Sequence, residues 1–271
     1  MFEFIKKWIF GTSVALSPII DDASLIENRM EKTVTFNLVK EENGVEILID
    51  TENDFMRQDK AYLTKMYDVL RVKESPFTLL DIGAGVGNVC LLAKYFPSSR
   101  WFAIEPVKEK IDLLKKNIEL NQLFMVDCFE KAILNQNDKF IYQLELESHG
   151  STQITDISDH TKEVDAISVD FFCREHGLEQ VDFLKIKATN SEWKILLGAK
   201  ECLMRDRPVI FLDLSRQAFR QNGSKLKEIK KFLKECRYKT RNIGVKKWMC
   251  TPIEQLSLFE GQDKIHAQAA V

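Results

Sequence analysis

The residue types best suited to chemistry gather in one short glycine-rich segment. An acid, Asp81, ends an apolar run, and Gly83, Gly85 and Gly87 follow at alternate positions, before an apolar-periodic stretch over residues 89–96. Glycine permits positive φ and removes side chains that would block a ligand against the backbone. A turn that opens a helix also presents backbone N–H groups to carboxylate or phosphate. The segment is therefore predicted to be a strand, a tight turn and a helix start that together hold a nucleotide-like cofactor.

The spacing of the glycines distinguishes between two possible kinds of cofactor. The NAD fingerprint is G-x-G-x-x-G/A, but here the third glycine comes one residue early and Asn88 stands in its place. An acid two residues before G-x-G-x-G is the usual loop for S-adenosyl-L-methionine (SAM) in class I methyltransferases, so we expect SAM and disfavour NAD-dependent oxidoreduction. The residues expected to hold the methionine end and the nearby ribose are Asp81, Gly83, Ala84, Gly85, Gly87 and Asn88.

A second acid supports a nucleoside ligand. The predicted strand over residues 101–104 ends in Glu105 and Pro106. A carboxylate at the end of the second strand can accept two hydrogen bonds from ribose hydroxyls. Glu105 is expected to do so, with Pro106 beside it, and Ala132 and Ile133 are expected to flank the adenine.

The pattern of the whole chain predicts an α/β fold. Apolar residues alternate on both sides of Asn43-Gly44, which predicts a β-hairpin within residues 33–50, and helical spacing follows over residues 59–72. From Phe77 strands and helices alternate, which indicates a mostly parallel sheet with helices on both faces. Combined with the SAM-type glycine loop, this leads us to expect the Rossmann-like class I methyltransferase fold. The predicted helices are 107–121, 191–204 and 224–236, and the predicted strands are 124–128, 131–134, 140–146, 164–169, 181–186, 208–214, 239–243 and 246–250.

Four segments are expected along the chain. Residues 1–30 are an apolar helical segment, residues 31–76 a hairpin and helix that cover the cofactor site, residues 77–252 the methyltransferase domain, and residues 253–271 a loose polar tail. The first twenty residues are too short and too interrupted to span a bilayer. A helix packed on the domain or on a partner, an interfacial amphipathic helix and a signal peptide stay open.

Composition narrows the classes of function. The net charge of −2 predicts no general attraction to nucleic acid. The six cysteines form no C-x-x-C pair, which indicates neither a metal site nor a disulfide framework but a cytoplasmic protein, alternatively one peripheral to the inner face of a membrane. Twelve Lys or Arg fall within residues 216–247. They are either a solvated face or an anion-binding rim for a phosphorylated or nucleotide-linked sugar.

The chain resembles the FkbM-type methyltransferases, SAM-dependent enzymes that mostly O-methylate sugars and related natural products. The matching segments run in order from about Leu79 to Leu214 and include LLDIGAGVGN, FAIEP, LLKKNIELN, HGSTQI, ISVDFF, VDFLKIKATNSEWKILLGAKECL and RPVIFLDL. The resemblance implies a SAM-dependent O-methyltransferase whose acceptor is a carbohydrate or a glycan- or glycolipid-like molecule. A homo-oligomer stays open. The alternative is a catalytically degenerate domain that binds SAM or serves as a scaffold subunit.

One segment departs from the family pattern K-x-D-x-E-G-x-E. Lys185 and Glu192 are retained, but Lys187, Thr189 and Asn190 replace the family's Asp, Glu and Gly. The resemblance places this strand end beside the transferred methyl group. Lys187 is either a neutral base in a desolvated site, a binder of an anionic acceptor, or a mark of lost catalysis.

A hydroxyl acceptor benefits from a general base. Lys185, Lys187, Glu192 and His149 are the expected catalytic residues, with Asp182 and Asp213 as further candidates for the base. Two of these carboxylates also have a structural interpretation, because Glu192 suits the first turn of its helix and Asp182 lies at the start of its strand.

Overall fold

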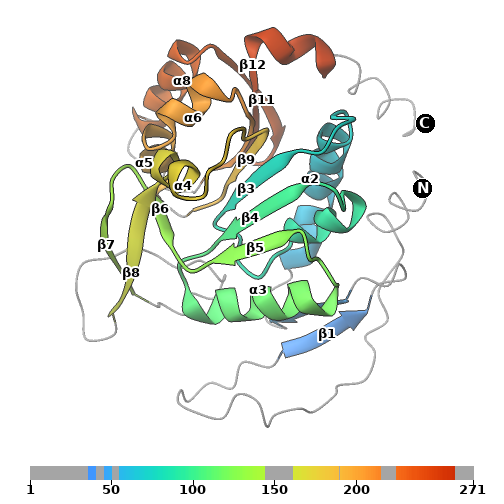
Figure 1. The fold of residues 1–271 in the computed structure, drawn as a ribbon. Helices are drawn as coiled ribbons and strands as arrows, with labels where there is room; N and C mark the ends of the chain where they lie inside the picture. The colour runs from blue at the N-terminus through green and yellow to red at the C-terminus, as the bar shows by residue number, and fades with distance from the viewer. Residues whose placement is uncertain are drawn as a thin grey trace.

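The computed structural model describes residues 36–40, 46–50, 55–143, 161–188, 190–214 and 224–259 (Figure 1). The first two strands, β1 (Phe36–Lys40) and β2 (Glu46–Asp50), pair antiparallel with Phe36 opposite Asp50. Helix α2 (Phe55–Leu70) follows. This confirms the N-terminal hairpin and helix of the predicted fold.

A seven-stranded sheet forms the centre of the protein. Its strand order is β11-β12-β10-β9-β3-β4-β5. All neighbours from β10 to β5 are parallel, whereas β12 runs antiparallel to both β10 and β11. The strands are β3 (Thr78–Ile82), β4 (Arg100–Ile104), β5 (Val126–Phe129), β9 (Phe183–Ile186), β10 (Val209–Asp213), β11 (Tyr238–Gly244) and β12 (Lys247–Pro252).

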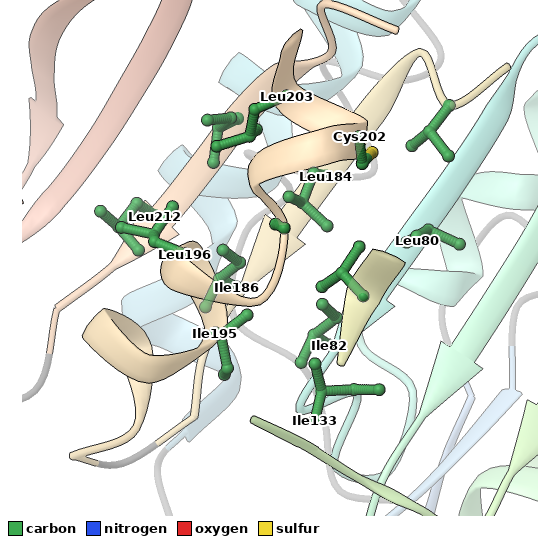
Figure 2. Close-up of a cluster of buried hydrophobic side chains, with 14 of the residues drawn as sticks. Leu80, Ile82, Ile133, Leu184, Ile186, Ile195, Leu196, Cys202, Leu203 and Leu212 are labelled. Carbon is green, nitrogen blue, oxygen red and sulfur yellow. The ribbon is translucent and has the colours of Figure 1, made fainter. Parts of the chain in front are cut away.

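The chain covers both faces of this sheet, as predicted (Figure 1). Successive strand residues point to opposite faces, so Leu79 joins the core under α2 while Leu80 joins the core on the other face. Figure 2 shows the second core, in which side chains of β3, β9 and β10 meet those of α5 and α6. The remaining helices are the 3₁₀ helix η2 (Cys90–Tyr95), α3 (Lys108–Leu120), α4 (Val169–Glu175), α5 (Glu192–Leu197), α6 (Lys200–Arg205) and α8 (Ser224–Glu235).

Three strands form a separate small sheet. β6 (Ala132–Leu134) pairs parallel with β8 (Thr161–Ser168), and β7 (Asp138–Gln143) pairs antiparallel with β8. These strands were expected from their apolar content, but the sequence does not indicate that they leave the main sheet. β6 packs on α5, at the carboxyl edge of the parallel strands (Figure 1).

The prediction of one helix over residues 191–204 is wrong, because the segment forms two helices, α5 and α6. The break lies at Gly198, whose carbonyl accepts a hydrogen bond from the Asp170 N–H. A Cβ on Gly198 would come within 2.2 Å of the Leu134 carbonyl oxygen, so β6 approaches the helix junction there. The Asp170 carboxylate then caps α6 by accepting from the N–H groups of Glu201 and Cys202.

The loose tail was predicted to begin at Ile253, and this is wrong for its first residues. Ile253–Leu258 form the 3₁₀ helix η4 and Phe259 is buried in the core under α2. The apolar ring of Phe259 lies in a polar stretch, and its burial in the core anchors this part of the chain. Within the residues the structure describes, no helix is long and apolar enough to cross a membrane.

Candidate functional site

The glycine-rich loop connects β3 to η2, and all three of its glycines have positive φ. A Cβ on Gly83 (φ 73°) would lie 1.9 Å from the Lys187 carbonyl oxygen, and one on Gly87 (φ 101°) would lie 2.5 Å from the Leu114 side chain. A Cβ on Gly85 (φ 60°) would meet no atom within 4 Å. Gly83 and Gly87 are therefore needed for packing inside the protein, whereas Gly85 faces open space.

The backbone N–H groups of the loop do not form the expected anion cradle. Gly83 and Ala84 both donate to the Ile104 carbonyl at the end of β4, at 2.9 and 3.1 Å, and Gly87 donates to Ala84. The prediction that these donors await a ligand is therefore wrong for those three residues. These three donors are used within the protein.

Glu105 ties the loop to the next helix. Its side chain is buried, and its two oxygens accept from the Gly85 N–H at 2.8 Å and the Val107 N–H at 3.1 Å. Pro106 lies in the chain between Glu105 and Val107. A carboxylate has about four lone-pair sites, so two N–H bonds leave acceptor capacity on a group that lies next to the open side of Gly85.

Two asparagines complete the surroundings of the loop. The Asn117 side chain on α3 donates to the Val86 carbonyl at 2.8 Å and is 1% exposed. Asn88 is buried, and its Oδ1 has no hydrogen-bond partner among the residues described. Asn88 was predicted from its place in the loop. Asn117 was missed, although a polar residue three positions after Leu114, on the apolar face of a predicted helix, is the signal that could have found it.

Lys185 lies beneath the loop rather than on its open side. Its side chain is 3% exposed, and its ammonium is 2.6 Å from Asp81 Oδ1 and donates to the Gly83 carbonyl at 2.8 Å. The Cys90 thiol also donates to Asp81, and burial together with the Asp81 charge raises the pKa of that thiol well above its usual value. Lys185 and Asp81 therefore act on the loop from below, as positioning residues.

Lys187, Asp213 and Lys247 form a group that we name the lysine–aspartate cluster. It lies at the carboxyl end of β9 and β10, where Lys247 donates to Asp213 at 2.8 Å and Lys187 lies 3.9 Å from the same carboxylate oxygen. Parallel pairing of β9 with β10 brings Lys187 and Asp213 together. Lys247 is the last residue of the basic stretch over residues 216–247, and it comes opposite Asp213 because β12 pairs antiparallel with β10.

Asn190 and Glu192 lie just before and at the start of α5. Glu192 is the first residue of the helix and is buried, which suits an acid near the positive end of the helix dipole. Asn190 has φ 66°. Glycine adopts that conformation without strain, and asparagine is among the side chains that tolerate it best. The departure from the family's glycine is therefore conformationally mild.

The backbone of Asn190 predicts how substitutions there behave. Asn190→Gly is expected to leave the free energy of unfolding within about 0.5 kcal/mol of the parent, because glycine adopts the same positive φ without strain. Asn190→Ala is expected to lower it by about 1 kcal/mol, because alanine lacks the short polar side chain that lets asparagine tolerate positive φ. Urea unfolding of the two variants side by side measures the difference. Equal stabilities would contradict this assignment.

The other predicted residues are placed as follows. Asp182 accepts from the Thr78 N–H and pairs with Lys73 at the start of β9, opposite the loop, so it is a structural residue. Ala132 and Ile133 are buried in β6, with Ile133 near Ile82 in the core (Figure 2). His149 lies outside the described residues, as do Thr189 and residues 1–30. The described part of the chain holds no cluster of three potential metal ligands.

The mostly parallel sheet has one reversed strand near an edge, and a glycine loop follows its inner strand β3. These features define a class I methyltransferase fold. The sequence profile of the Methyltransferase FkbM domain matches residues 81–240, more than half of the chain. The chain therefore belongs to the FkbM methyltransferase family, and the predicted family and fold class are confirmed. No curated protein sequence matches the chain.

Several solved structures are similar to the chain. A Methyltransferase FkbM from Methylobacillus flagellatus has 13% identity and a TM-score of 0.47, with 65% of this chain and 43% of that chain covered. A SAM-dependent methyltransferase from Agrobacterium tumefaciens has 11% identity and a TM-score of 0.47, with 82% and 72% covered. TYW2 from M. jannaschii, in complex with AdoMet, has 17% identity and a TM-score of 0.44, with 82% and 86% covered. This chain therefore spans less than half of the M. flagellatus protein.

Proposed function

We propose that the protein is a SAM-dependent O-methyltransferase that acts on a hydroxyl group of a carbohydrate or glycolipid-like acceptor. The observation that carries the proposal is the open side of Gly85 next to the Glu105 carboxylate. A glycine with φ 60° and no atom within 4 Å of its Cβ position leaves the space that a nucleoside needs against the backbone.

The residues around the loop fit SAM. Glu105 keeps acceptor capacity for the two ribose hydroxyls, and the Asn88 carbonyl oxygen is a buried acceptor without a partner among the described residues, suited to the ammonium of the methionine end. Bound SAM supplies an electrophilic methyl group on a sulfonium. The contribution of the protein is then position and electrostatics.

Each remaining group has a task in this proposal. Lys185 and Asp81 hold the first glycine of the loop in place from below. Lys187 faces the acceptor side from the end of β9. Glu192 and His149 are the candidates to accept the proton of the acceptor hydroxyl, because Asp213 is already engaged by Lys247.

The first test is titration calorimetry with SAM and S-adenosylhomocysteine. We expect micromolar binding by the parent protein and a loss of about 100-fold for Glu105→Ala, because two hydrogen bonds to a charged acceptor disappear. Glu105→Gln keeps the shape and one acceptor oxygen and is expected to fall between the two. Glu109→Ala, the same change at an exposed site on α3, serves as the matched control and should bind like the parent.

The outcomes separate the two functions left open. Binding that is lost only in the Glu105 variants establishes the cofactor site and justifies a screen of acceptors, in which methyl transfer distinguishes the enzyme from a degenerate domain that only binds SAM. If a well-folded parent protein binds neither compound, the enzyme is excluded and the degenerate scaffold subunit becomes the better proposal. A melting curve for each variant shows whether a loss of binding reflects unfolding, since Glu105 also anchors the loop.

A further inference from the structure

The outer face of α8 carries four exposed lysines in one row. They are spaced i, i+3, i+4 and i+7, the helical repeat that places side chains on a single face. The apolar residues Ile229, Phe232 and Leu233 of the same helix are buried in the core. The four residues, which we name the lysine stripe, are Lys227, Lys230, Lys231 and Lys234. The helix therefore presents one apolar face to the protein and one basic face to its surroundings.

The two acids of α8 lie beside the lysine stripe rather than within it. Each residue of an α-helix is rotated by about 100° from the one before, so the stripe spans an arc of about 100°. Glu228 and Glu235 both fall on one flank of that arc. Lys231 lies 3.9 Å from Glu235, and both side chains are exposed, which makes this a weak surface pair. Among the residues of α8, only lysines lie in the arc itself.

An exposed apolar side chain lies in the turn between β11 and β12. It is Val245, whose side chain is 85% exposed. β12 pairs antiparallel with β10, and the Leu214 N–H donates to the Lys246 carbonyl at 2.9 Å. The turn therefore lies at the carboxyl end of β10, on the edge of the sheet where ligands of parallel strands bind.

The lysine stripe and the Val245 turn border the same rim of the protein. α8 packs on β11 (Figure 1), and the Lys230 ammonium lies 5.2 Å from the centroid of the Trp248 ring, three residues after Val245. α8 ends beside the start of β11, where Tyr238 lies opposite Pro252 at the other end of the strands. The helix therefore begins toward the carboxyl edge, next to the turn.

We propose that the lysine stripe and the Val245 turn dock the protein on an anionic lipid bilayer, with the carboxyl edge of the sheet at the membrane surface. A lysine near an anionic bilayer strengthens binding about fivefold, and an aliphatic side chain adds an apolar contact at the headgroup boundary. The net charge of the whole chain is −2, so the attraction belongs to this face and orients the protein.

A bilayer is the occupant that these residues favour. The side chain exposed beside the lysines, Val245, is aliphatic, which suits insertion among lipids. Binding of single-stranded nucleic acid relies instead on aromatic rings that stack on the bases. The docking presents the acceptor side of the sheet to a glycolipid-like acceptor, and in this respect it rests on the proposed function.

Sedimentation with lipid vesicles tests the proposal. The full chain is mixed at low salt with vesicles of phosphatidylcholine alone, or of equal parts phosphatidylcholine and phosphatidylglycerol. We expect about 100-fold stronger partitioning onto the anionic vesicles. Added salt should weaken this preference, because it screens exposed charges. A DNA duplex in place of the vesicles measures attraction to an anionic polymer.

Variants assign the binding to its surface. Lys227→Gln/Lys234→Gln removes the two central lysines of the stripe and should weaken binding to anionic vesicles about 25-fold. Lys115→Gln/Lys116→Gln makes the same charge change at exposed lysines on α3, by the opposite edge of the sheet, and should weaken it less than about twofold. Val245→Ser should weaken it about threefold, a loss that persists at high salt because apolar burial is not screened.

Several results would overturn the proposal: no binding to anionic vesicles, equal partitioning onto both kinds of vesicle, binding to DNA but not to vesicles, or equal losses in the two double variants. Unchanged vesicle binding by Lys227→Gln/Lys234→Gln would also overturn it and assign membrane contact to another segment, such as residues 1–20. Calorimetry with S-adenosylhomocysteine on the same samples distinguishes these results from failure of the proposed function, because cofactor binding is expected to be equal in the parent and every vesicle variant.

Discussion

Gly83→Ala is expected to destabilise the protein by about 3 kcal/mol and to abolish SAM binding. Two costs add at this position. A residue with a Cβ at φ 73° loses about 1–2 kcal/mol, and the Cβ would lie 1.9 Å from the Lys187 carbonyl oxygen, a backbone atom that cannot rotate away. Overpacking of this kind costs about 1–3 kcal/mol. β9 would have to separate from the loop, which disturbs the Lys185 and Lys187 contacts together.

Two other glycines provide matched controls for this prediction. Gly177 has φ 58° and open space around its Cβ position, so Gly177→Ala should cost only the backbone term, about 1 kcal/mol. Gly85→Ala should cost about the same in stability yet still weaken SAM binding, because its methyl group enters the open side of the loop. Urea unfolding and calorimetry on the three variants measure both effects. Equal destabilisation by Gly83→Ala and Gly177→Ala would contradict the prediction, because it would show that β9 moves away from the loop at little cost in stability.

The main features of the fold could be predicted because they depend on local periodicity. Residues 107–121 show a helical apolar spacing and form α3, and the alternation around Asn43-Gly44 predicts the pairing of β1 with β2. The break at Gly198 could not be predicted, because it depends on the approach of β6, which is distant in sequence. The anchoring of Phe259 is likewise a tertiary contact with no local signal.

Parts of the site could be predicted from the sequence where a residue type at a given position has a single structural role. The positive φ of the loop glycines and the position of Glu105 after its strand follow from the pattern. Burial was not predictable, and burial decides whether a lysine serves the fold or the ligand. Lys185 and Lys187 are two residues apart on one strand end, yet one is 3% exposed under the loop and the other 33% exposed at the rim.

Lys185→Met is the second variant with a large expected effect. Methionine replaces the stem of the lysine but not its ammonium, so Asp81 remains a carboxylate at 1% exposure without its ion-pair partner. Removal of one member of a buried pair costs about 3–5 kcal/mol, mostly because the other charge stays buried. The Gly83 carbonyl also loses a donor. We expect that loss of stability in urea unfolding, together with weaker binding of S-adenosylhomocysteine.

The double variant Lys185→Met/Asp81→Asn shows whether charge is the cause. If the cost comes from an uncompensated carboxylate, replacing it with a neutral amide should restore about 2 kcal/mol, so that the two substitutions are not additive. Lys231→Met, which breaks a surface pair, should change stability by less than about 0.5 kcal/mol. Strict additivity of the two substitutions would mean that Lys185 stabilises the loop through the Gly83 carbonyl alone. Restored stability with binding still weak would instead assign to Lys185 the task of shaping the loop for its cofactor.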